Sequence, residues 1–140
     1  MNKKVLILCT GNSCRSIIAE ALIDSELKGV EAESSGIKAS GRVNSNAKKV
    51  LVNEGIWRDS YHSKTLDTVI DKDYDLIVTV CGHAHETCPM FPRAIRTIHV
   101  GFEDPDGKDL DAFQKTLQEI RKVLLPEVQK ALYPHDSKTT

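Results

Sequence analysis

The residues best suited to chemistry form one segment, Cys9-Thr-Gly-Asn-Ser-Cys-Arg-Ser16, which holds two thiols and a guanidinium group. The backbone N–H groups of such a loop can surround a tetrahedral oxyanion, with a helix N-terminus behind them. Arg15 can add two parallel hydrogen bonds to the anion. The same positive potential would lower the pKa of the Cys9 thiol and make it nucleophilic, and Ser16 could donate a hydrogen bond to the thiolate. We therefore predict an oxyanion site formed by Thr10, Gly11, Asn12, Ser13, Cys14, Arg15 and Ser16.

A strand and a helix must hold this loop in place. The apolar run Val5-Leu-Ile-Leu8 precedes the loop and is typical of a strand buried on both faces. A helix is expected from Cys14 to about Leu27, and Gly11 and Asn12 between the two elements tolerate positive φ. The alternative is a tight turn that only happens to contain two buried cysteines. The strand, glycine, arginine and helix together favour the anion site.

A second pair of cysteines, Cys81 and Cys88, follows the apolar run 76–80 and encloses Gly-His-Ala-His-Glu-Thr. Reduction of an oxyanion by two electrons consumes two thiols, and regeneration of the first thiol requires a third. Hydrolysis of a phosphate ester would need only Cys9, so the extra pair favours redox chemistry. Two alternatives are buried cysteines that only fill space, and a metal site. The metal site would use Cys81, His83, His85 and Cys88, but their spacing matches none of the usual zinc patterns.

The spacing of this pair also predicts a change of conformation. In a regular helix the Cα atoms of Cys81 and Cys88 would lie about 10.5 Å apart. A disulfide requires a Cα separation of about 4.4–6.8 Å. We therefore expect the segment to rearrange between its reduced and oxidised forms.

The rest of the chain alternates predicted strands and helices. This rhythm predicts an α/β fold: a single domain over 1–133, with a central parallel four-stranded sheet flanked by helices on both faces. The tail 134–140 is polar and expected to be frayed. The carboxyl ends of the strands would bring Cys9, Cys81 and Gly101 to one edge of the sheet. The expected elements are strands at 31–35, 76–80 and 95–100, a helix capped at Asn44 and ended by Gly55, a short turn capped by Ser63 or Thr65, and a last helix over 110–124 interrupted at Pro126.

Composition limits the partners of the protein. The 140 residues include 19 basic and 20 acidic side chains, so the net charge is −1. A nucleic-acid-binding protein would need a basic surplus. No apolar run reaches the 18 or so residues that a membrane span requires, and the run after Met1 is too short for a signal peptide. We expect a cytoplasmic monomer whose four cysteines are not structural disulfides.

Several motifs together resemble one known family. The segment from Cys9 to Ser16 resembles the loop of the low-molecular-weight tyrosine phosphatase superfamily, and within it most closely that of the thioredoxin-coupled arsenate reductases. The resemblance covers about residues 5–108. It extends through Ser34-Ser-Gly-Ile37, Asn44, His62, Val80-Cys-Gly82 with Cys88-Pro89, and Gly101-Phe-Glu-Asp-Pro105.

The resemblance implies a relay of three thiols that reduces arsenate. Cys9 attacks arsenic while Arg15 and the loop hold the oxygens, and Asp104 acts as the general acid for the departing oxygen. Cys81 then attacks Cys9, which releases arsenite and leaves a Cys9–Cys81 disulfide. Cys88 moves the disulfide to Cys81–Cys88, where thioredoxin reduces it. No organic cofactor is implied, and Cys14 would have a structural role.

The chain departs from the phosphatases of this superfamily after Asp104-Pro105. Those enzymes carry aromatic residues there to grip a tyrosine ring, whereas this chain has Asp106-Gly-Lys108 and only 5% aromatic residues. We expect Glu103 and Asp106 to be solvated, and Trp57 and Tyr61 to pack against the second and third helices. A phosphatase with regulatory cysteines is the alternative function, and a non-catalytic metal- or arsenite-binding module is the third.

Some members of the reductase family also bind potassium beside the loop. Asn12, Glu20 and Ser34 match the ligand positions, but Thr65 stands where the family has an aspartate. Loss of a carboxylate weakens a site for a hard cation. The sequence leaves potassium binding open and predicts no other metal.

Overall fold

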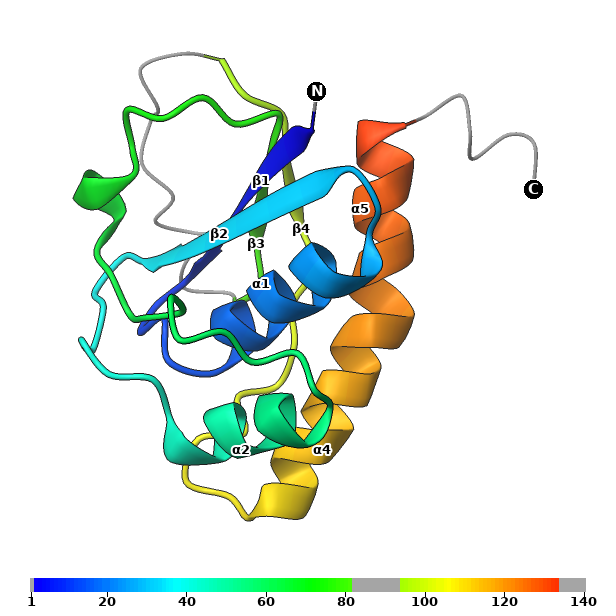
Figure 1. The fold of residues 1–140 in the computed structure, drawn as a ribbon. Coiled ribbons are helices and arrows are strands. Elements are labelled where there is room, and N and C mark those ends of the chain that lie inside the picture. Colours follow the sequence, from blue (N-terminus) through cyan, green and yellow to red (C-terminus); the bar gives the residue numbers. More distant parts are fainter. Residues whose placement is uncertain (1, 82–93, 134–140) are drawn as a thin grey trace.

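The computed structural model describes residues 2–81 and 94–133 (Figure 1). Four strands form one sheet in the order β2-β1-β3-β4, and every neighbouring pair is parallel. This confirms the predicted parallel four-stranded sheet. The strands are β1 (Lys3–Cys9), β2 (Val30–Gly36), β3 (Leu76–Thr79) and β4 (Thr97–His99).

The central strand β1 carries the loop that precedes α1. Its residues Val5 to Leu8 are fully buried, as the unbroken apolar run predicts. They pair with β2 on one side and with β3 on the other. The end of β1 is therefore fixed from both sides, directly before the loop that starts at Cys9.

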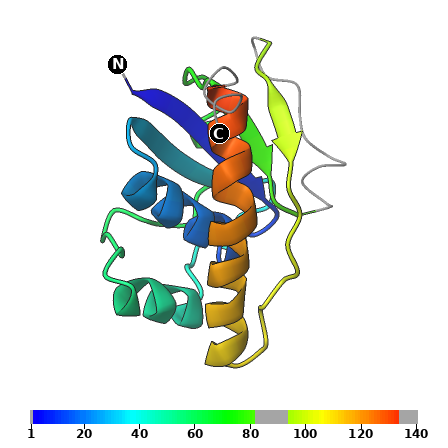
Figure 2. The ribbon, with the colours of Figure 1, turned by 90° about the vertical axis from the view of Figure 1, so that its right-hand side faces the viewer.

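Helices cover one face of the sheet. Helix α1 packs against β1 and β2, and its other neighbours are α2 and the C-terminal helical run. In the view of Figure 2, α4, η2 and α5 form one continuous run beside α1. The elements are α1 (Arg15–Glu26), α2 (Ser45–Asn53), α4 (Leu110–Glu119), the π-helical turn η2 (Ile120–Leu124) and α5 (Leu125–Leu132).

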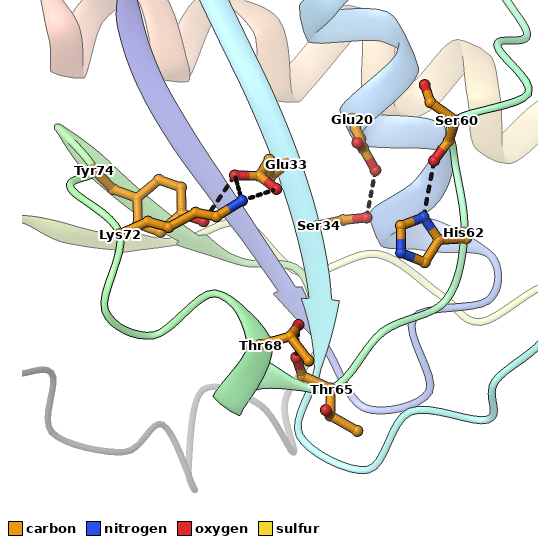
Figure 3. Close-up of polar contacts among 9 residues, drawn as sticks. All are labelled: Glu20, Glu33, Ser34, Ser60, His62, Thr65, Thr68, Lys72 and Tyr74. Atoms are coloured by element: carbon orange, nitrogen blue, oxygen red, sulfur yellow. Dashed lines mark hydrogen bonds and ion pairs between the residues drawn. The ribbon is translucent and has the colours of Figure 1, made fainter.

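The opposite face of β2 is covered by the chain around the short 3₁₀ helix η1 (Leu66–Thr68). Alternate residues of a strand point to opposite faces. Ser34 contacts Glu20 of α1, whereas its neighbour Glu33 bonds to Lys72 and Tyr74 after η1 (Figure 3). Both faces of this strand are therefore covered, one by α1 and the other by the chain around η1.

The predicted interruption near Pro126 takes the form of a π-helical turn. Proline lacks the N–H group that an α-helix interior uses, and a π turn is one way in which a helix absorbs an irregularity. Here η2 separates α4 from α5, and Pro126 lies in the first turn of α5. The α-helical pattern is interrupted, yet the helical run continues across the molecule.

One of the two predicted helix caps is confirmed. Asn44 Oδ1 accepts from the N–H groups of Asn46 and Ala47, and so caps α2. The predicted capping of the short turn by a Ser63 or Thr65 side chain is wrong. The Thr65 side chain makes no capping bond to η1, and the Ser63 hydroxyl donates instead to the carbonyl of Gly11 at 3.1 Å.

Among the described residues, no helix combines the length and the apolar character that crossing a bilayer requires. The predicted tail 134–140 lies outside the described residues, as do His83, His85 and Cys88.

Candidate active site

The carboxyl edge of the sheet brings together the three predicted segments. We call residues 9–16 the anion loop; it begins at the last residue of β1 and runs into α1. Cys81 follows β3, and its sulfur lies 3.2 Å from the Thr10 hydroxyl. The chain after β4 also reaches the loop, since Arg15 Nη1 donates to the carbonyl of Phe102 at 3.0 Å. The sheet thus joins residues that are 71 and 87 positions apart.

The backbone of the anion loop is turned so that it can bind an anion. Its carbonyl groups point outward, because each accepts a hydrogen bond from the chain after β2. Peptide planarity makes each N–H point opposite to the carbonyl of the residue before it, so the N–H groups that follow point inward. The carbonyls of Cys9, Thr10, Gly11 and Ser13 accept from the N–H groups of Ile37, Lys38, Ser40 and Asn44, respectively, at 2.9–3.0 Å.

Asn12 holds the loop in an uncommon conformation. Its φ of 49° is in the left-handed region, which asparagine tolerates better than most residues. The side chain is fully buried, and Nδ2 donates to the hydroxyls of Ser16 and Ser34 at 2.8 and 2.9 Å. Its Oδ1 accepts from the Lys64 N–H at 2.9 Å. Hydrogen bonds therefore hold both polar atoms of the Asn12 side-chain amide in place.

The Cys9 and Cys81 thiols lie close enough for hydrogen bonding between them to act on the pKa of Cys9. Cys9, Cys14 and Cys81 are buried. Hydrogen bonding with Cys81 and burial raise the pKa of Cys9, while the Arg15 guanidinium and the Thr10 N–H act to lower it. This corrects the expectation of a lowered Cys9 pKa. Two thiols that share one hydrogen bond in a buried site do not both ionise readily, and that effect exceeds the attraction of Arg15.

Arg15 is anchored but keeps a donor free. Its side chain is 13% exposed, and besides the Phe102 carbonyl it meets Asp104, whose Oδ2 lies 3.5 Å from Nη2. The buried Nε has no partner within the described part of the chain. A buried donor without a partner is costly, and an oxyanion in the loop would satisfy it.

Asp104 lies at the mouth of the site. Its side chain is 52% exposed, which gives it access to both the anion and water. Its Oδ1 accepts from the Asp106 N–H at 3.0 Å, and Asp106 Oδ1 in turn accepts from Asn44 Nδ2 at 2.9 Å. Asp106 is exposed, as predicted, and its carboxylate also connects this loop to the start of α2. Glu103 is exposed and pairs with Lys108, as expected for a surface side chain.

The other two polar groups of the loop are set apart from the nucleophile. Burial raises the pKa of Cys14 to about 11, so its thiol is neutral near pH 7. A neutral buried thiol favours the predicted structural role. Ser16 is fully buried and accepts from Asn12, which leaves its own proton available for donation. The bond from Ser16 to the Cys9 thiolate stays a prediction.

A polar pocket of about 580 Å³ opens beside the anion loop. Among the described residues that line this pocket, none is aromatic. Trp57 and Tyr61 instead stack edge-on at 5.7 Å, with Lys48 of α2 over the Trp57 ring and Asp24 of α1 bonded to the Tyr61 hydroxyl. Trp57 therefore contacts the second helix, as predicted, whereas Tyr61 bonds to the first helix and not to the third. The pocket is lined by Ser13, Ser40, Arg42, Val43, Asn44, Ser45 and Asp106.

Sequence reasoning missed two residues that support the loop. Gly36 ends β2, and a Cβ there would lie 2.6 Å from the Thr10 carbonyl oxygen, so a larger side chain would displace the loop. A glycine at the end of a strand was the available signal. Lys64 binds Asn12 through its backbone, and no local pattern marks it. Within residues 2–81 and 94–133, no group of three or more His, Cys, Asp or Glu side chains could hold a metal ion.

Comparison with known proteins identifies related sequences and folds. The family model for low molecular weight phosphotyrosine protein phosphatase matches residues 4–132. An arsenate reductase of Brevibacillus brevis is 43% identical over 121 residues, which cover 85% of this chain and 90% of that protein. The crystal structure of arsenate reductase from Archaeoglobus fulgidus has a TM-score of 0.76 and 34% identity, covering 89% and 98% of the two chains. A low molecular weight protein tyrosine phosphatase from T. tengcongensis has a TM-score of 0.80 and 27% identity, covering 92% and 99%.

Proposed function

The chain belongs to the low molecular weight phosphotyrosine protein phosphatase family, and we propose that it reduces arsenate to arsenite by a relay of three cysteines. The names of its relatives support arsenate as the substrate. The observation that carries the relay is the position of Cys81 at the anion loop, next to Cys9, where the Cys81 sulfur lies 3.2 Å from the Thr10 hydroxyl. Hydrolysis needs one thiol, whereas reduction needs a second one within reach of the first.

Arsenate is a tetrahedral oxyanion and would fill the anion loop. The inward N–H groups and the N-terminus of α1 supply positive potential without a basic surface. Arg15 Nε adds a donor that has no other partner among the described residues. These donors are already oriented, so binding costs little reorganisation.

The first chemical step is attack of Cys9 on arsenic, with the thiol proton passing to an oxygen of the bound arsenate. A sulfur–arsenic bond forms and one arsenic–oxygen bond breaks, while arsenic stays in the +5 state. Asp104 gives its proton to the departing oxygen, which leaves as water. Arg15 lies next to this carboxyl group and holds the remaining oxygens.

The second step transfers two electrons. The Cys81 thiolate attacks the sulfur of Cys9, so a sulfur–sulfur bond forms and the sulfur–arsenic bond breaks. The electron pair of that bond stays on arsenic, which becomes arsenite in the +3 state. The Thr10 hydroxyl, 3.2 Å from the Cys81 sulfur, can donate to the thiolate and stabilise it before attack.

The third step restores Cys9. Cys88 attacks Cys81 in the Cys9–Cys81 disulfide, which frees the Cys9 thiolate and forms Cys81–Cys88. The dithiol of thioredoxin then supplies the two electrons that reduce this disulfide. No organic cofactor takes part. We expect a monomer that works in the cytoplasm, where thioredoxin is kept reduced.

The test is arsenate-dependent NADPH consumption with thioredoxin and thioredoxin reductase, together with single turnover in their absence. We expect steady turnover in wild type and background rates in Cys9→Ser and Cys81→Ser. Cys88→Ser should release about one arsenite per chain, because the first disulfide still forms, and should then stop. Cys14→Ser is the matched control and should keep turning over. Steady turnover in Cys88→Ser at the wild-type rate would contradict the relay.

Phosphatase activity is the alternative, favoured by the family and by the shared anion loop with Arg15 and Asp104. The polar pocket without aromatic lining argues against a phosphotyrosine ring as the preferred leaving group. Rapid hydrolysis of aryl phosphates by wild type and by Cys81→Ser, with no arsenate turnover, would establish this alternative.

A further inference from the structure

The carboxyl group of Asp104 is followed directly by a tight turn. The Lys108 N–H donates to the Pro105 carbonyl at 2.9 Å, and Gly107 has a φ of 82°. A turn with this closing bond requires positive φ at its third position, where glycine is preferred. The turn directs the Asp106 N–H to Asp104 Oδ1 at 3.0 Å. The backbone after the acid thus turns back and holds it.

Both oxygens of the Asp104 carboxyl group have partners. Oδ1 accepts from the Asp106 N–H, and Oδ2 lies 3.5 Å from Arg15 Nη2. Each oxygen has a second lone pair, so the group can still carry an acid proton. The side chain is 52% exposed, and an exposed side chain keeps its rotamer freedom unless bonds restrict it. The charges of Asp104 and Asp106 both act to raise the pKa of Cys14, as expected for carboxylates close to the anion loop.

Asp106 is itself held by Asn44, which is fixed from two other sides. Asn44 Nδ2 donates to Asp106 Oδ1 at 2.9 Å, although the two residues are 62 positions apart. Asn44 Oδ1 accepts from the N–H groups of Asn46 and Ala47 at the start of α2. The Asn44 N–H donates to the Ser13 carbonyl in the anion loop at 2.9 Å. One asparagine therefore connects the turn after the acid to α2 and to the anion loop.

We propose that Asn44 and Asp106 are positioning residues that hold the general acid, Asp104, over the anion loop. They act through the hydrogen bond between their side chains and through the Asp106 N–H. The inference rests on the proposed function in one respect, which is that Asp104 protonates a departing oxygen. Hydrolysis of a phosphate ester would use the same step, so the inference does not require arsenate reduction.

The bond is expected to affect the chemical step more than anion binding. An oxygen that leaves arsenic as water must be protonated, so the rate depends on how often the Asp104 carboxyl group lies within reach of it. Anion binding depends instead on Arg15 and on the N–H groups of the anion loop, which other segments hold. Loss of the bond should therefore lower the rate at saturating arsenate and leave the affinity for an inert oxyanion nearly unchanged.

Exchange of the donor and the acceptor provides a selective test. Asn44→Asp keeps the cap of α2, because asparagine and aspartate cap helices about equally well, but it removes the donor and sets two carboxylates against each other. The double variant Asn44→Asp/Asp106→Asn has the net charge of the wild type, and its bond can form again with donor and acceptor exchanged. Asp106→Asn alone keeps an acceptor for Asn44, whereas Asp106→Ala does not.

The activity measurement is the rate of a single turnover at saturating arsenate without thioredoxin, so that later thiol exchange does not limit it. We expect Asn44→Asp and Asp106→Ala to be about fivefold slower than wild type, as for loss of one hydrogen bond to a charged group. Asp106→Asn and the double variant should stay within about twofold of wild type. Glu103→Ala is the matched control, since it removes an exposed carboxylate next to Asp104 that pairs only with Lys108 among the described residues.

Calorimetry with sulfate separates positioning from a general loss of structure. Asp106→Ala and Glu103→Ala remove the same charge, so both should bind sulfate within about twofold of wild type. A loss of sulfate affinity in Asp106→Ala as large as its loss of rate would overturn the proposal. So would a double variant no faster than Asn44→Asp, or equal rates in Asp106→Ala and Glu103→Ala.

A third measurement requires no turnover. Solvent exchange of the N–H of residue 106, followed by nuclear magnetic resonance, reports its bond to Asp104 Oδ1. Asn44→Asp should speed this exchange about fivefold when residue 106 is aspartate, and less than twofold in an Asp106→Asn background. The same effect in both backgrounds, or none in either, would overturn the proposal. The expected exchange rates without arsenate reduction would contradict the proposed function alone.

Discussion

At the scale of single residues, the neighbourhood of Cys9 is the main determinant of chemistry. Arg15 and the loop N–H groups attract negative charge, yet the bond with Cys81 and burial keep the pKa of Cys9 raised. The site therefore keeps the Cys9 thiol protonated until its proton is removed. In the proposed relay, Cys81 is the neighbouring thiol that would form the disulfide with Cys9.

Replacement of Cys81 by alanine should lower the pKa of Cys9, because the hydrogen bond with Cys81 is the largest cause of its elevation. The thiolate then forms at lower pH, and the rate of Cys9 alkylation should begin to rise at lower pH than in wild type. The measurement is the pH dependence of iodoacetamide modification, with the modified cysteine identified by mass spectrometry.

The control for this prediction is Cys14→Ala, whose sulfur lies 3.6 Å from the Ser13 hydroxyl. It should leave the Cys9 profile within about 0.5 pH unit of wild type, less than the typical spread of side-chain pKa values. Identical alkylation profiles for wild type and Cys81→Ala would contradict the assignment.

At the scale of elements, strand and helix ends position the site. β1 ends at Cys9, and the N-terminus of α1 lies behind the loop. The end of β2 lies directly against the loop at Gly36, where it leaves no space for a side chain. On the far side of α1, the π-helical turn presents Arg121 to carboxylates at the ends of two helices, Glu26 of α1 and Glu54 after α2.

We expect Gly36→Ala to destabilise the protein by about 2–3 kcal/mol, since the new methyl group would overlap backbone rather than a side chain that can move. Its Cβ would lie 2.6 Å from the Thr10 oxygen and 3.1 Å from the Ala39 Cα. Sulfate affinity should fall as well, because the loop must shift. Urea unfolding and calorimetry measure the two effects.

The neighbouring Ser35→Ala is a suitable control for that substitution. The Ser35 hydroxyl is buried and has no hydrogen-bond partner among the described residues, so its removal should be neutral or slightly stabilising. If both substitutions had the same small effect on stability, close packing of β2 against the anion loop would be refuted.

Arg121→Met should destabilise the fold by about 1 kcal/mol, because one guanidinium holds two partly buried carboxylates. The bonds to Glu26 and Glu54 measure 2.9 and 2.6 Å. The difference in stability between Arg121→Met and wild type should be smaller at high salt, because salt already weakens these ion pairs in wild type. Lys122→Met, an exposed substitution in the same turn, is the control for urea unfolding. Equal stability of the two variants would show that the helix ends do not depend on Arg121.

At the scale of the whole molecule, attraction for the anion is local. The net charge is −1, so no broad basic surface concentrates anions, and the donors of one loop must do so. That loop contacts the chain after β2, the segment at Ser63 and Lys64, and the chain after β4. A ligand in the loop would therefore bind where three other segments of the chain contact the loop, and only the folded protein brings these segments together.

Sulfate should stabilise the entire domain against unfolding, because only the folded chain brings these segments together. At a concentration of about 100 times the dissociation constant, the gain should be about 2.7 kcal/mol. The measurement is the shift of the urea midpoint, with an unchanged dependence of the unfolding free energy on urea. The Arg15→Lys variant should lose most of the gain, because lysine cannot reproduce the geometry of the guanidinium. A shift of the same size in that variant would mean that sulfate acts outside the loop.

Features that depend on local pattern could be predicted from the residues alone. The apolar run before Cys9 specified a buried strand, and the Gly-Asn and arginine that follow specified an anion loop, because burial and backbone conformation are encoded by neighbouring residues. The sheet class followed from the alternation of such segments. Capping at Asn44 was predictable for the same reason. The predicted capping by Ser63 was wrong because its hydroxyl binds Gly11, which is far away in the sequence.

Only the tertiary structure decided which distant residues meet. The contact of Cys81 with Thr10 joins positions 71 apart, and the bond from Lys64 to Asn12 joins positions 52 apart. Such pairings follow from the order and register of the strands, and no single segment encodes them. The type and position of the cysteines thus indicated redox chemistry. Their arrangement at the sheet edge, which the strand order sets, placed Cys81 beside Cys9 and the Lys64 backbone against Asn12.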